Sequence, residues 1–176
     1  MFASLRLCRG THLHHLWLDL DDNPGDMKKN ILIADDDPSV RKSLAKVLKD
    51  VAYNVIEAVD GAEAVEQFKS GPVDLLLLDI DLPIRDGWDV FGTITGQAPD
   101  LPIIIITGKD NQYDTAVAAG VGTLMEKPLD VAQLLETIQE LLAESKEARL
   151  RRLDDYRHHI HYIPSARPSL REKLHS

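Results

Sequence analysis

Residues 75–83 read Leu-Leu-Leu-Leu-Asp-Ile-Asp-Leu-Pro, and this stretch decides the fold. Four consecutive leucines are typical of a strand that is buried on both faces of a parallel sheet. The carboxylate of Asp79 follows directly, where the strand must end. Because ligands of open α/β sheets bind outside the carboxyl ends of the strands, the sequence predicts that Asp79 lies at a functional edge.

Five apolar runs, the leucine run included, have the length of strands, and helical patterns alternate with them. The Asp37-Pro38 pair predicts the N-cap and first position of the first helix. Five strands alternating with five helices predict an α/β fold, a doubly wound parallel sheet with helices on both faces. The strands are expected near residues 31–34, 53–58, 73–78, 103–106 and 123–125, and the helices near 38–49, 62–68, 88–94, 112–119 and 131–142.

Composition restricts the function further. The 176 residues suit one domain with additional segments at its ends, and the net charge of −9 argues against general affinity for nucleic acid or for an anionic membrane. The single cysteine, Cys8, permits no internal disulfide, which fits a reducing compartment. No apolar run approaches the roughly 20 residues that a membrane span needs. We therefore expect a cytoplasmic protein.

The chain divides into three parts by pattern. Residues 1–27 show no sustained period and predict a flexible leader, whose histidines we interpret as solvated and not as metal ligands. Residues 28–147 hold the alternating pattern and form the predicted domain. Residues 148–176 are expected to form a helical extension, continuous with the last helix through about residue 153, and a flexible tail. From Lys146 onward there are eight Lys or Arg and four Asp or Glu, so this end is basic.

Polar side chains stand at the ends of four predicted strands. Asp35-Asp36 follow the first strand and Asp79 the third, while Thr107 follows the fourth and Lys127 the fifth. These ends share one edge of a parallel sheet, where crowded carboxylates are costly without a cation. Hard oxygen ligands suit Mg²⁺. Lys127 and Thr107 could together hold the oxygens of a phosphoryl group.

Five blocks in this order resemble the receiver domain of two-component response regulators, a group that includes chemotaxis regulators. A single block would be weak evidence, but five blocks at the expected strand ends make a chance match very unlikely. The resemblance covers residues 28 to about 147. The blocks are residues 33–38, 78–83, 86–87, 106–108 and 126–128.

The resemblance implies a flavodoxin-like strand order 2-1-3-4-5 and a phosphorylated switch. Asp79 would be the phosphoacceptor, with Thr107 and Lys127 contacting the phosphoryl group. Mg²⁺ would be held by Asp36, Asp79 and the backbone carbonyl of Asp81, and Asp35 would help to hold it through water. The family often has a cis peptide bond at the position of Lys127-Pro128.

The resemblance also implies the partners. They would be a sensor histidine kinase or phosphotransfer protein and a downstream effector protein, with a homodimer left open and no turnover of an external substrate expected. One position departs from the family, because Leu124 stands where an aromatic residue usually reports phosphorylation to the output surface. We expect weaker or different coupling to that surface.

Two functions of other classes stay open at this point. A DNA-contacting regulator could act through the basic C-terminal tail. A Mg²⁺-dependent phosphatase on a similar sheet could use Asp79 as nucleophile and Asp81, two residues on, as general acid.

Overall fold

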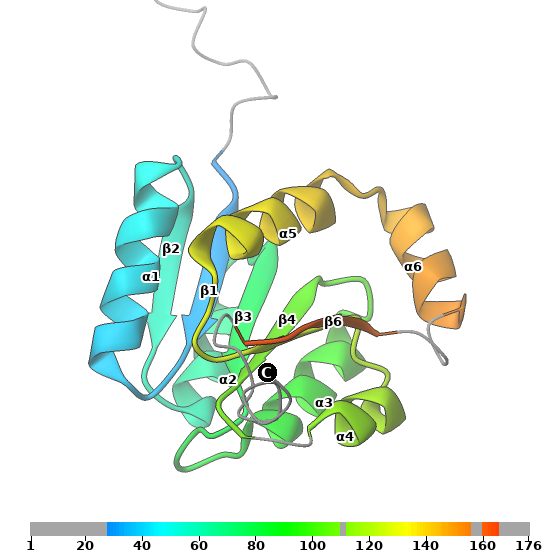
Figure 1. Ribbon diagram of the computed structural model, residues 1–176, viewed down its shortest axis with the longest axis horizontal. Helices are drawn as coiled ribbons and strands as arrows, with labels where there is room; N and C mark the ends of the chain where they lie inside the picture. The colour runs from blue at the N-terminus through cyan, green and yellow to red at the C-terminus, as the bar shows by residue number, and fades with distance from the viewer. Residues whose placement is uncertain (1–27, 110–111, 156–159, 166–176) are drawn as a thin grey trace, which may run out of the picture.

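A computed structural model of the chain describes residues 28–109, 112–155 and 160–165. Its strands form one sheet in which every neighbouring pair is parallel, in the order β2-β1-β3-β4-β5-β6 (Figure 1). The doubly wound parallel sheet and the order 2-1-3-4-5 are confirmed. The strands are β1 (Asn30–Ala34), β2 (Asn54–Ala58), β3 (Leu75–Asp79), β4 (Ile103–Thr107), β5 (Thr123–Glu126) and β6 (His161–Ile163).

Helices cover both faces of the sheet (Figure 1). One apolar cluster joins α1 and α5 to one face, and a second joins α2, α3 and α4 to the other. This is the arrangement that crossover connections between parallel strands produce. The helices are α1 (Pro38–Asp50), α2 (Gly61–Ser70), α3 (Gly87–Gln97), α4 (Tyr113–Ala119), α5 (Val131–Ala143) and α6 (Lys146–Asp155).

The leucine run is the centre of both clusters. Leu75 and Leu77 face the α1 and α5 side, Leu76 and Leu78 face the opposite side, and all four are fully buried. Alternation along a strand places successive side chains on opposite faces, so an unbroken apolar run is required when both faces are covered. The strand ends then meet at one edge, because Ala34 pairs with Leu78 and Asp79 with Ile106.

Side-chain caps start the helices that follow this edge. The Asp37 carboxylate accepts hydrogen bonds from the backbone N–H groups of Ser39 (2.7 Å) and Val40 (3.4 Å), and Pro38 occupies the first turn, as predicted. Asp60 caps α2 in the same way, and Asp130 caps α5. Each cap satisfies N–H groups that have no partner within the helix, and so fixes where the chain leaves the edge.

The expectation of five strands is wrong by one. β6 pairs with β5 in parallel, with His161 opposite Thr123 and Ile163 opposite Met125. It lies within the segment for which the sequence predicts a flexible tail. Three residues with a single buried side chain, Ile163, carry too little pattern to be recognised as a strand. The predicted leader, residues 1–27, and the rest of the tail, residues 166–176, lie outside the described residues.

The expectation of one continuous helix through residue 153 is also wrong. α5 ends at Ala143, and α6 begins at Lys146 and runs in a different direction (Figure 1). The Ser145 hydroxyl accepts a hydrogen bond from Ala148 N–H (3.1 Å) and so caps the new helix. Among the described residues, no helix combines the length and the apolar character that crossing a bilayer requires.

Candidate functional site

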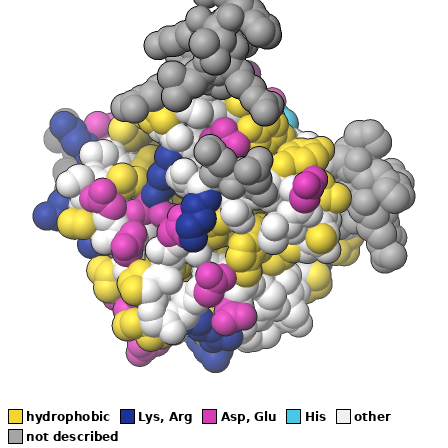
Figure 2. Space-filling model, turned by 60° about the horizontal axis from the view of Figure 1, so that its bottom comes forward, with side chains coloured by type: hydrophobic (Ala, Val, Ile, Leu, Met, Phe, Trp, Pro, Cys, Tyr) yellow, Lys and Arg dark blue, Asp and Glu magenta, His cyan; other side chains and the backbone are white. Residues whose placement is uncertain are grey.

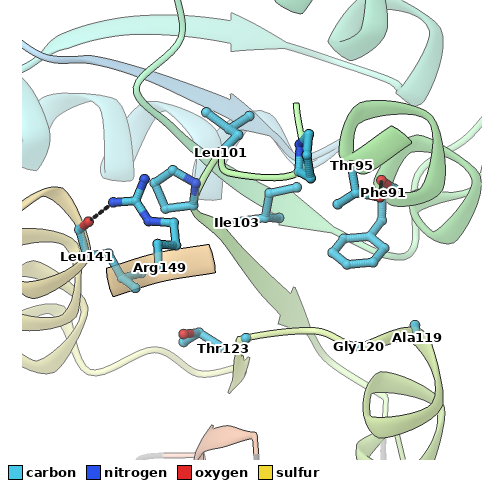
Figure 3. A pocket seen from close by; sticks show the side chains of 12 residues that line it. Phe91, Thr95, Leu101, Ile103, Ala119, Gly120, Thr123, Leu141 and Arg149 are labelled. Carbon is cyan, nitrogen blue, oxygen red and sulfur yellow. Dashed lines mark hydrogen bonds between the residues drawn. The ribbon is translucent and has the colours of Figure 1, made fainter. Parts of the chain in front are cut away.

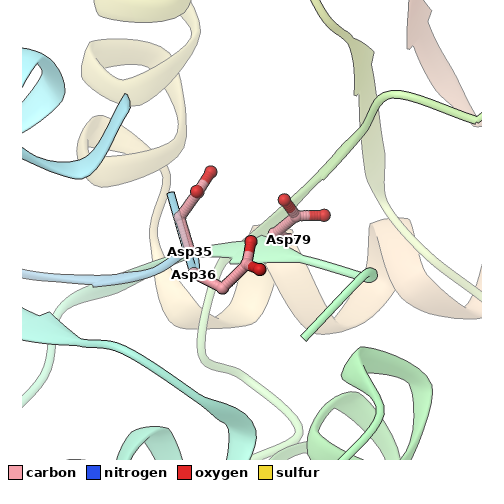
Figure 4. A group of neighbouring side chains, drawn as sticks. All are labelled: Asp35, Asp36 and Asp79. Atoms are coloured by element: carbon pink, nitrogen blue, oxygen red, sulfur yellow. The ribbon is translucent and has the colours of Figure 1, made fainter. Parts of the chain in front are cut away.

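Three carboxylates converge at the carboxyl edge of the sheet. Asp35 and Asp36 follow β1, Asp79 ends β3, and each offers an oxygen within 4.8 Å of the others (Figure 4). Asp35 and Asp79 are only 2% and 3% exposed, whereas Asp36 is exposed. Carboxylates crowded in this way repel one another, and a cation with oxygen ligands relieves the repulsion.

Lys127 supplies one positive charge to this cluster. Its Nζ lies 2.8 Å from Oδ2 of Asp35 and 2.5 Å from Oδ2 of Asp79, and the Lys127–Pro128 peptide bond is cis. Burial lowers the pKa of the Lys127 ammonium, but its hydrogen bonds and charge interactions with the two acids outweigh this effect and leave the pKa raised. The lysine therefore stays protonated between the two buried acids.

The pKa of the Asp35 carboxyl is also raised, and burial is the main cause. Removal from water raises the pKa of this carboxyl above its ordinary value of 3.8, even though the hydrogen bond and charge of Lys127 lower it. The Lys127 ammonium thus does not fully offset the burial of the Asp35 carboxylate. The edge has the electrostatic character of a cation site.

Residues of the loops after β3 and β4 form a second set of polar contacts near Asp79. The backbone N–H of Asp81 donates to Oδ1 of Asp79 (2.9 Å), and the Asp81 side chain forms an ion pair with Lys109. The hydrogen bond that the Lys109 ammonium donates to the Asp81 carboxylate raises the pKa of Lys109. Thr107 is fully buried at the end of β4, and its hydroxyl accepts from the backbone N–H of Lys109 (3.0 Å). Thr107 therefore contacts the loop after β4, one strand away from Asp79.

The loop after Asp79 is held tightly against the strand end. A Cβ on Gly87 would lie 2.5 Å from the carbonyl oxygen of Asp79 and 2.5 Å from Cα of Ile80, so only glycine fits there. Gly87 N–H also donates to the Ile80 carbonyl (3.2 Å). The Asp86-Gly87 block of the sequence marks this position, although the sequence alone does not reveal the close approach.

Arg41 is a structural part of the site that sequence reasoning missed. It is 9% exposed on α1, its Nη1 donates to the Asp35 carbonyl (2.7 Å), and its Nε lies 3.6 Å from Glu57 on β2. The arginine thereby ties the backbone of Asp35 to two neighbouring elements. In the sequence it looks like a solvated residue between apolar helix positions, and no signal distinguishes it.

The surface around this edge is mixed in charge. Figure 2, which brings the lower side of Figure 1 toward the viewer, shows acidic and basic side chains next to one another.

A separate cavity of about 230 Å³ lies at the other end of the sheet. Ile103 and Thr123, which begin β4 and β5, line it together with Arg149 of α6 (Figure 3). Its location excludes it from the chemistry at Asp79.

Sequence comparison assigns the class of the protein. The response regulator receiver domain model matches residues 31–139, and the chain belongs to that family. The resemblance, the receiver function within a two-component system and the fold are thus confirmed.

Individual relatives agree with this assignment. The chain is 35% identical to the response regulator MprA of Mycobacterium tuberculosis over 122 residues, which are 68% of this chain and 53% of MprA. It is 34% identical to the response regulator GtcR of Aneurinibacillus migulanus over 123 residues, 69% of this chain and 50% of GtcR. The chain spans about half the length of these curated relatives.

Solved structures show the same domain. A CheY-like receiver domain protein from Methanospirillum hungatei JF-1 has a TM-score of 0.64 and 29% identity, over 69% of this chain and 98% of that one. The response regulator TrrA from Thermotoga maritima, in complex with Mg²⁺ and BeF, has a TM-score of 0.60 and 32% identity, over 64% of this chain and 98% of that one.

Proposed function

We propose that Asp79 accepts a phosphoryl group from a phosphohistidine of a sensor histidine kinase or phosphotransfer protein, and that the modified chain changes its binding to an effector protein. The observation that carries this proposal is the contact of one ammonium, that of Lys127, with two buried carboxylates at the strand ends. A nucleophilic carboxylate beside a fixed cation is suited to phosphoryl transfer, where charge on the phosphoryl oxygens must be offset.

Asp35, Asp36 and Asp79 fit Mg²⁺, since their oxygens lie within 4.8 Å of one another and are the hard donors this ion prefers. We assign the metal to these three carboxylates and to the backbone carbonyl of Asp81. When bound, Mg²⁺ supplies positive charge opposite the phosphoryl oxygens. The relative TrrA was solved with this ion, which supports the assignment.

The transfer balances without an added acid or oxidant. A carboxylate oxygen of Asp79 forms a bond to phosphorus as the phosphorus–nitrogen bond of the protonated phosphoimidazole breaks. The electron pair of that bond stays on the imidazole, which leaves neutral. Lys127, already 2.5 Å from Asp79, holds the transferred group by charge and hydrogen bonding. We assign Thr107 to one phosphoryl oxygen, since its hydroxyl accepts from Lys109 N–H and keeps its own O–H to donate.

An open groove beside this site is suited to the donor. It has a volume of about 620 Å³ and lies between Ser39, Val40 and Ser43 of α1 and the Lys127–Leu129 segment. Small hydroxyl and apolar side chains form its α1 wall, so a helix or loop that carries the phosphohistidine can approach Asp79 closely. We propose this groove as the docking position of the kinase or phosphotransfer protein.

We propose that the chain turns over no external substrate. The phosphatase alternative requires Asp81 as a proton donor, but the Asp81 carboxylate forms an ion pair with Lys109. We infer that a carboxylate engaged by a lysine ammonium does not serve as the general acid. Asp79 would therefore be modified and later hydrolysed, as expected for a switch.

Acetyl phosphate with Mg²⁺ tests the proposal by intact-protein mass spectrometry. The chain should gain about 80 Da, one phosphoryl group, and peptide mapping should place it on Asp79. Asp79→Asn and chelation of the metal should each abolish the gain, while Asp89→Asn, on the first turn of α3, should not change it. A gain of the same size in Asp79→Asn would refute the assignment.

A further inference from the structure

The edge of β5 is covered by a short segment from the C-terminal part of this same chain. Residues 160–165, here called the cover segment, contain β6 and lie beyond residue 139, where the family match ends. His161 N–H donates to the Gly122 carbonyl (3.1 Å), and Ser165 N–H donates to the Glu126 side chain (3.4 Å). The cover segment therefore contacts β5 from one end to the other.

The attachment is weak for a strand. Three residue pairs form the ladder, and His161 and Tyr162 are exposed. Ile163 is 5% exposed, and Ile160 is partly buried against the apolar cluster that contains α2 and α3. Segments with few buried apolar contacts open at low free-energy cost, and parallel pairing is the less stable kind. Two apolar side chains and a short ladder therefore hold the cover segment on β5.

An aromatic contact ties the cover segment to the start of α4. The ring of Tyr162 lies 5.6 Å from that of Tyr113, centroid to centroid, with 79° between their planes. Tyr162 pairs in register with Leu124 of β5. The aromatic contact therefore joins the cover segment, at the register position of Leu124, to α4.

Two contacts of the cover segment are made with residues that lie near the phosphoacceptor edge in the sequence. Glu126, which accepts from Ser165, is adjacent to Lys127, whose ammonium contacts Asp79. The backbone N–H of Lys109 donates to the Thr107 hydroxyl, and the Lys109 ammonium forms an ion pair with Asp81. Tyr113, the first residue of α4, follows Lys109 by four positions in the sequence.

We propose that the cover segment is a built-in inhibitory strand, which occupies the β5 edge in the unphosphorylated chain and is released when Asp79 is phosphorylated. The contact between Tyr113 and Tyr162 is the link through which the state of Asp79 would control this release. A phosphoryl group on Asp79 competes for the Lys109 ammonium and the Thr107 hydroxyl, because it adds negative charge and acceptor oxygens beside them. Lys109 then leaves Asp81, Tyr113 leaves Tyr162, and β5 becomes free for another strand. This inference rests on the proposed phosphoacceptor function.

Coupling of this kind is reciprocal. If phosphorylation weakens the cover, loss of the cover must favour the phosphorylated conformation by the same factor. Tyr162→Ala, which removes the aromatic contact from an exposed position, should therefore bind the phosphoryl mimic BeF with Mg²⁺ more tightly than the unchanged protein. Tyr162→Phe keeps the ring and should behave like the unchanged protein.

Hydrogen exchange of the full chain, read by mass spectrometry or NMR before and after acetyl phosphate with Mg²⁺, tests the release directly. We expect amides of residues 161–163 to exchange at least tenfold faster after phosphorylation. In Tyr162→Ala they should be fast already and change little. His161→Ala, an exposed control in the same strand, should keep the full response. The 80 Da gain is measured on the same sample.

The outcomes separate the two proposals. A complete 80 Da gain with unchanged exchange at 161–163 would overturn the release and leave the phosphoacceptor function intact. Absence of the gain would overturn both. Equal BeF affinity in Tyr162→Ala and the unchanged protein would show that the aromatic contact carries no coupling.

Discussion

The ammonium nitrogen of Lys127 lies 2.5 Å from Oδ2 of Asp79, although 48 positions separate the two residues in the chain. The distance is short because β3 and β5 flank β4 in one parallel sheet and end at the same edge. Asp35 shares the same ammonium from the end of β1, on the other side of β3. Four crossover connections, through α1, α2, α3 and α4, thus bring these three charged side chains to one edge of the sheet.

Removal of this charge should destabilise the chain. Lys127→Met leaves Asp35 and Asp79 buried without their cation, and we expect the free energy of unfolding at pH 7 to fall by about 1–3 kcal/mol. The deficit should shrink toward pH 5, because burial already raises the pKa of Asp35, loss of the neighbouring ammonium should raise it further, and protonation of Asp35 removes its charge. Urea denaturation without divalent metal at both pH values measures this. Lys109→Met, at an exposed ion pair, should change stability far less than Lys127→Met.

Gly87→Ala should disturb the strand end itself. The added methyl would lie 2.5 Å from backbone atoms of Asp79 and Ile80, which cannot move independently of the site. We expect a loss of about 2–3 kcal/mol in chemical denaturation and impaired acetyl phosphate labelling.

The same helix provides the control for this change. At Gly92 and Gly96, no atom lies within 4 Å of the position that a Cβ would take, so alanine there should stabilise α3 by about 0.5–1 kcal/mol and leave labelling unchanged. If Gly87→Ala also raised stability, the close packing at Asp79 would be refuted.

Asp100 should make the docking of α6 dependent on pH. Its hydrogen bond with Lys146 (2.8 Å), supported by the charges of Lys146 and Arg149, holds the pKa of this carboxyl below its ordinary value of 3.8. A lowered acid pKa gives stability that is present above the ordinary pKa and is lost as the pH falls through the lowered value. Asp100→Asn should therefore cost about 0.5 kcal/mol at pH 7 and nothing near pH 2.

A double-mutant cycle checks the partner. Lys146→Gln alone should cost about as much as Asp100→Asn, and the two together should cost little more than either one, because both remove the same ion pair. Fully additive losses at pH 7 would contradict the assignment of the pKa shift to this pair.

Ile84 is a site of backbone strain next to Asp79. It has φ +66° and a side chain that is 83% exposed, a combination that costs a β-branched residue about 1–2 kcal/mol without burying its apolar surface. Ile84→Gly should raise the free energy of unfolding by about 0.5–1 kcal/mol, since the greater chain entropy of glycine offsets part of the relief. Ile84→Ala keeps the strained backbone and should change stability less. A higher thermal midpoint for Ile84→Ala than for Ile84→Gly would argue against strain.

Sequence was sufficient for the parts of this molecule that follow from periodicity and strand direction. The leucine run predicted a strand buried on both faces, and Asp37-Pro38 predicted the first helix start. Because parallel strands end at one edge, the sequence alone predicted that Asp35, Asp79 and Lys127 meet. Thr107 was expected at the same edge, and its bond to Lys109 is a local detail that no spacing rule predicts.

The features that sequence missed depend on tertiary contacts. α5 ends where Arg149 turns back to donate to the Leu141 and Glu144 carbonyls, and neither glycine nor proline marks that point. β6 forms because Ile163 is buried beside Met125. The residues that flank Ile163 in the sequence show no periodic pattern that would predict a strand. The burial of Arg41 follows from the carbonyl of Asp35, which the helix pattern alone does not indicate.

The late turn into α6 matters for anyone who prepares fragments of this chain. A fragment trimmed at residue 147, where the sequence pattern alone ends the domain, would cut α6 in its first turn and lose both Arg149 and β6. Unpaired amides along β5 would then face the solvent, and bare strand edges invite self-association. Turbidity or spurious oligomers from such a fragment would report the trimming and not the behaviour of the intact polypeptide.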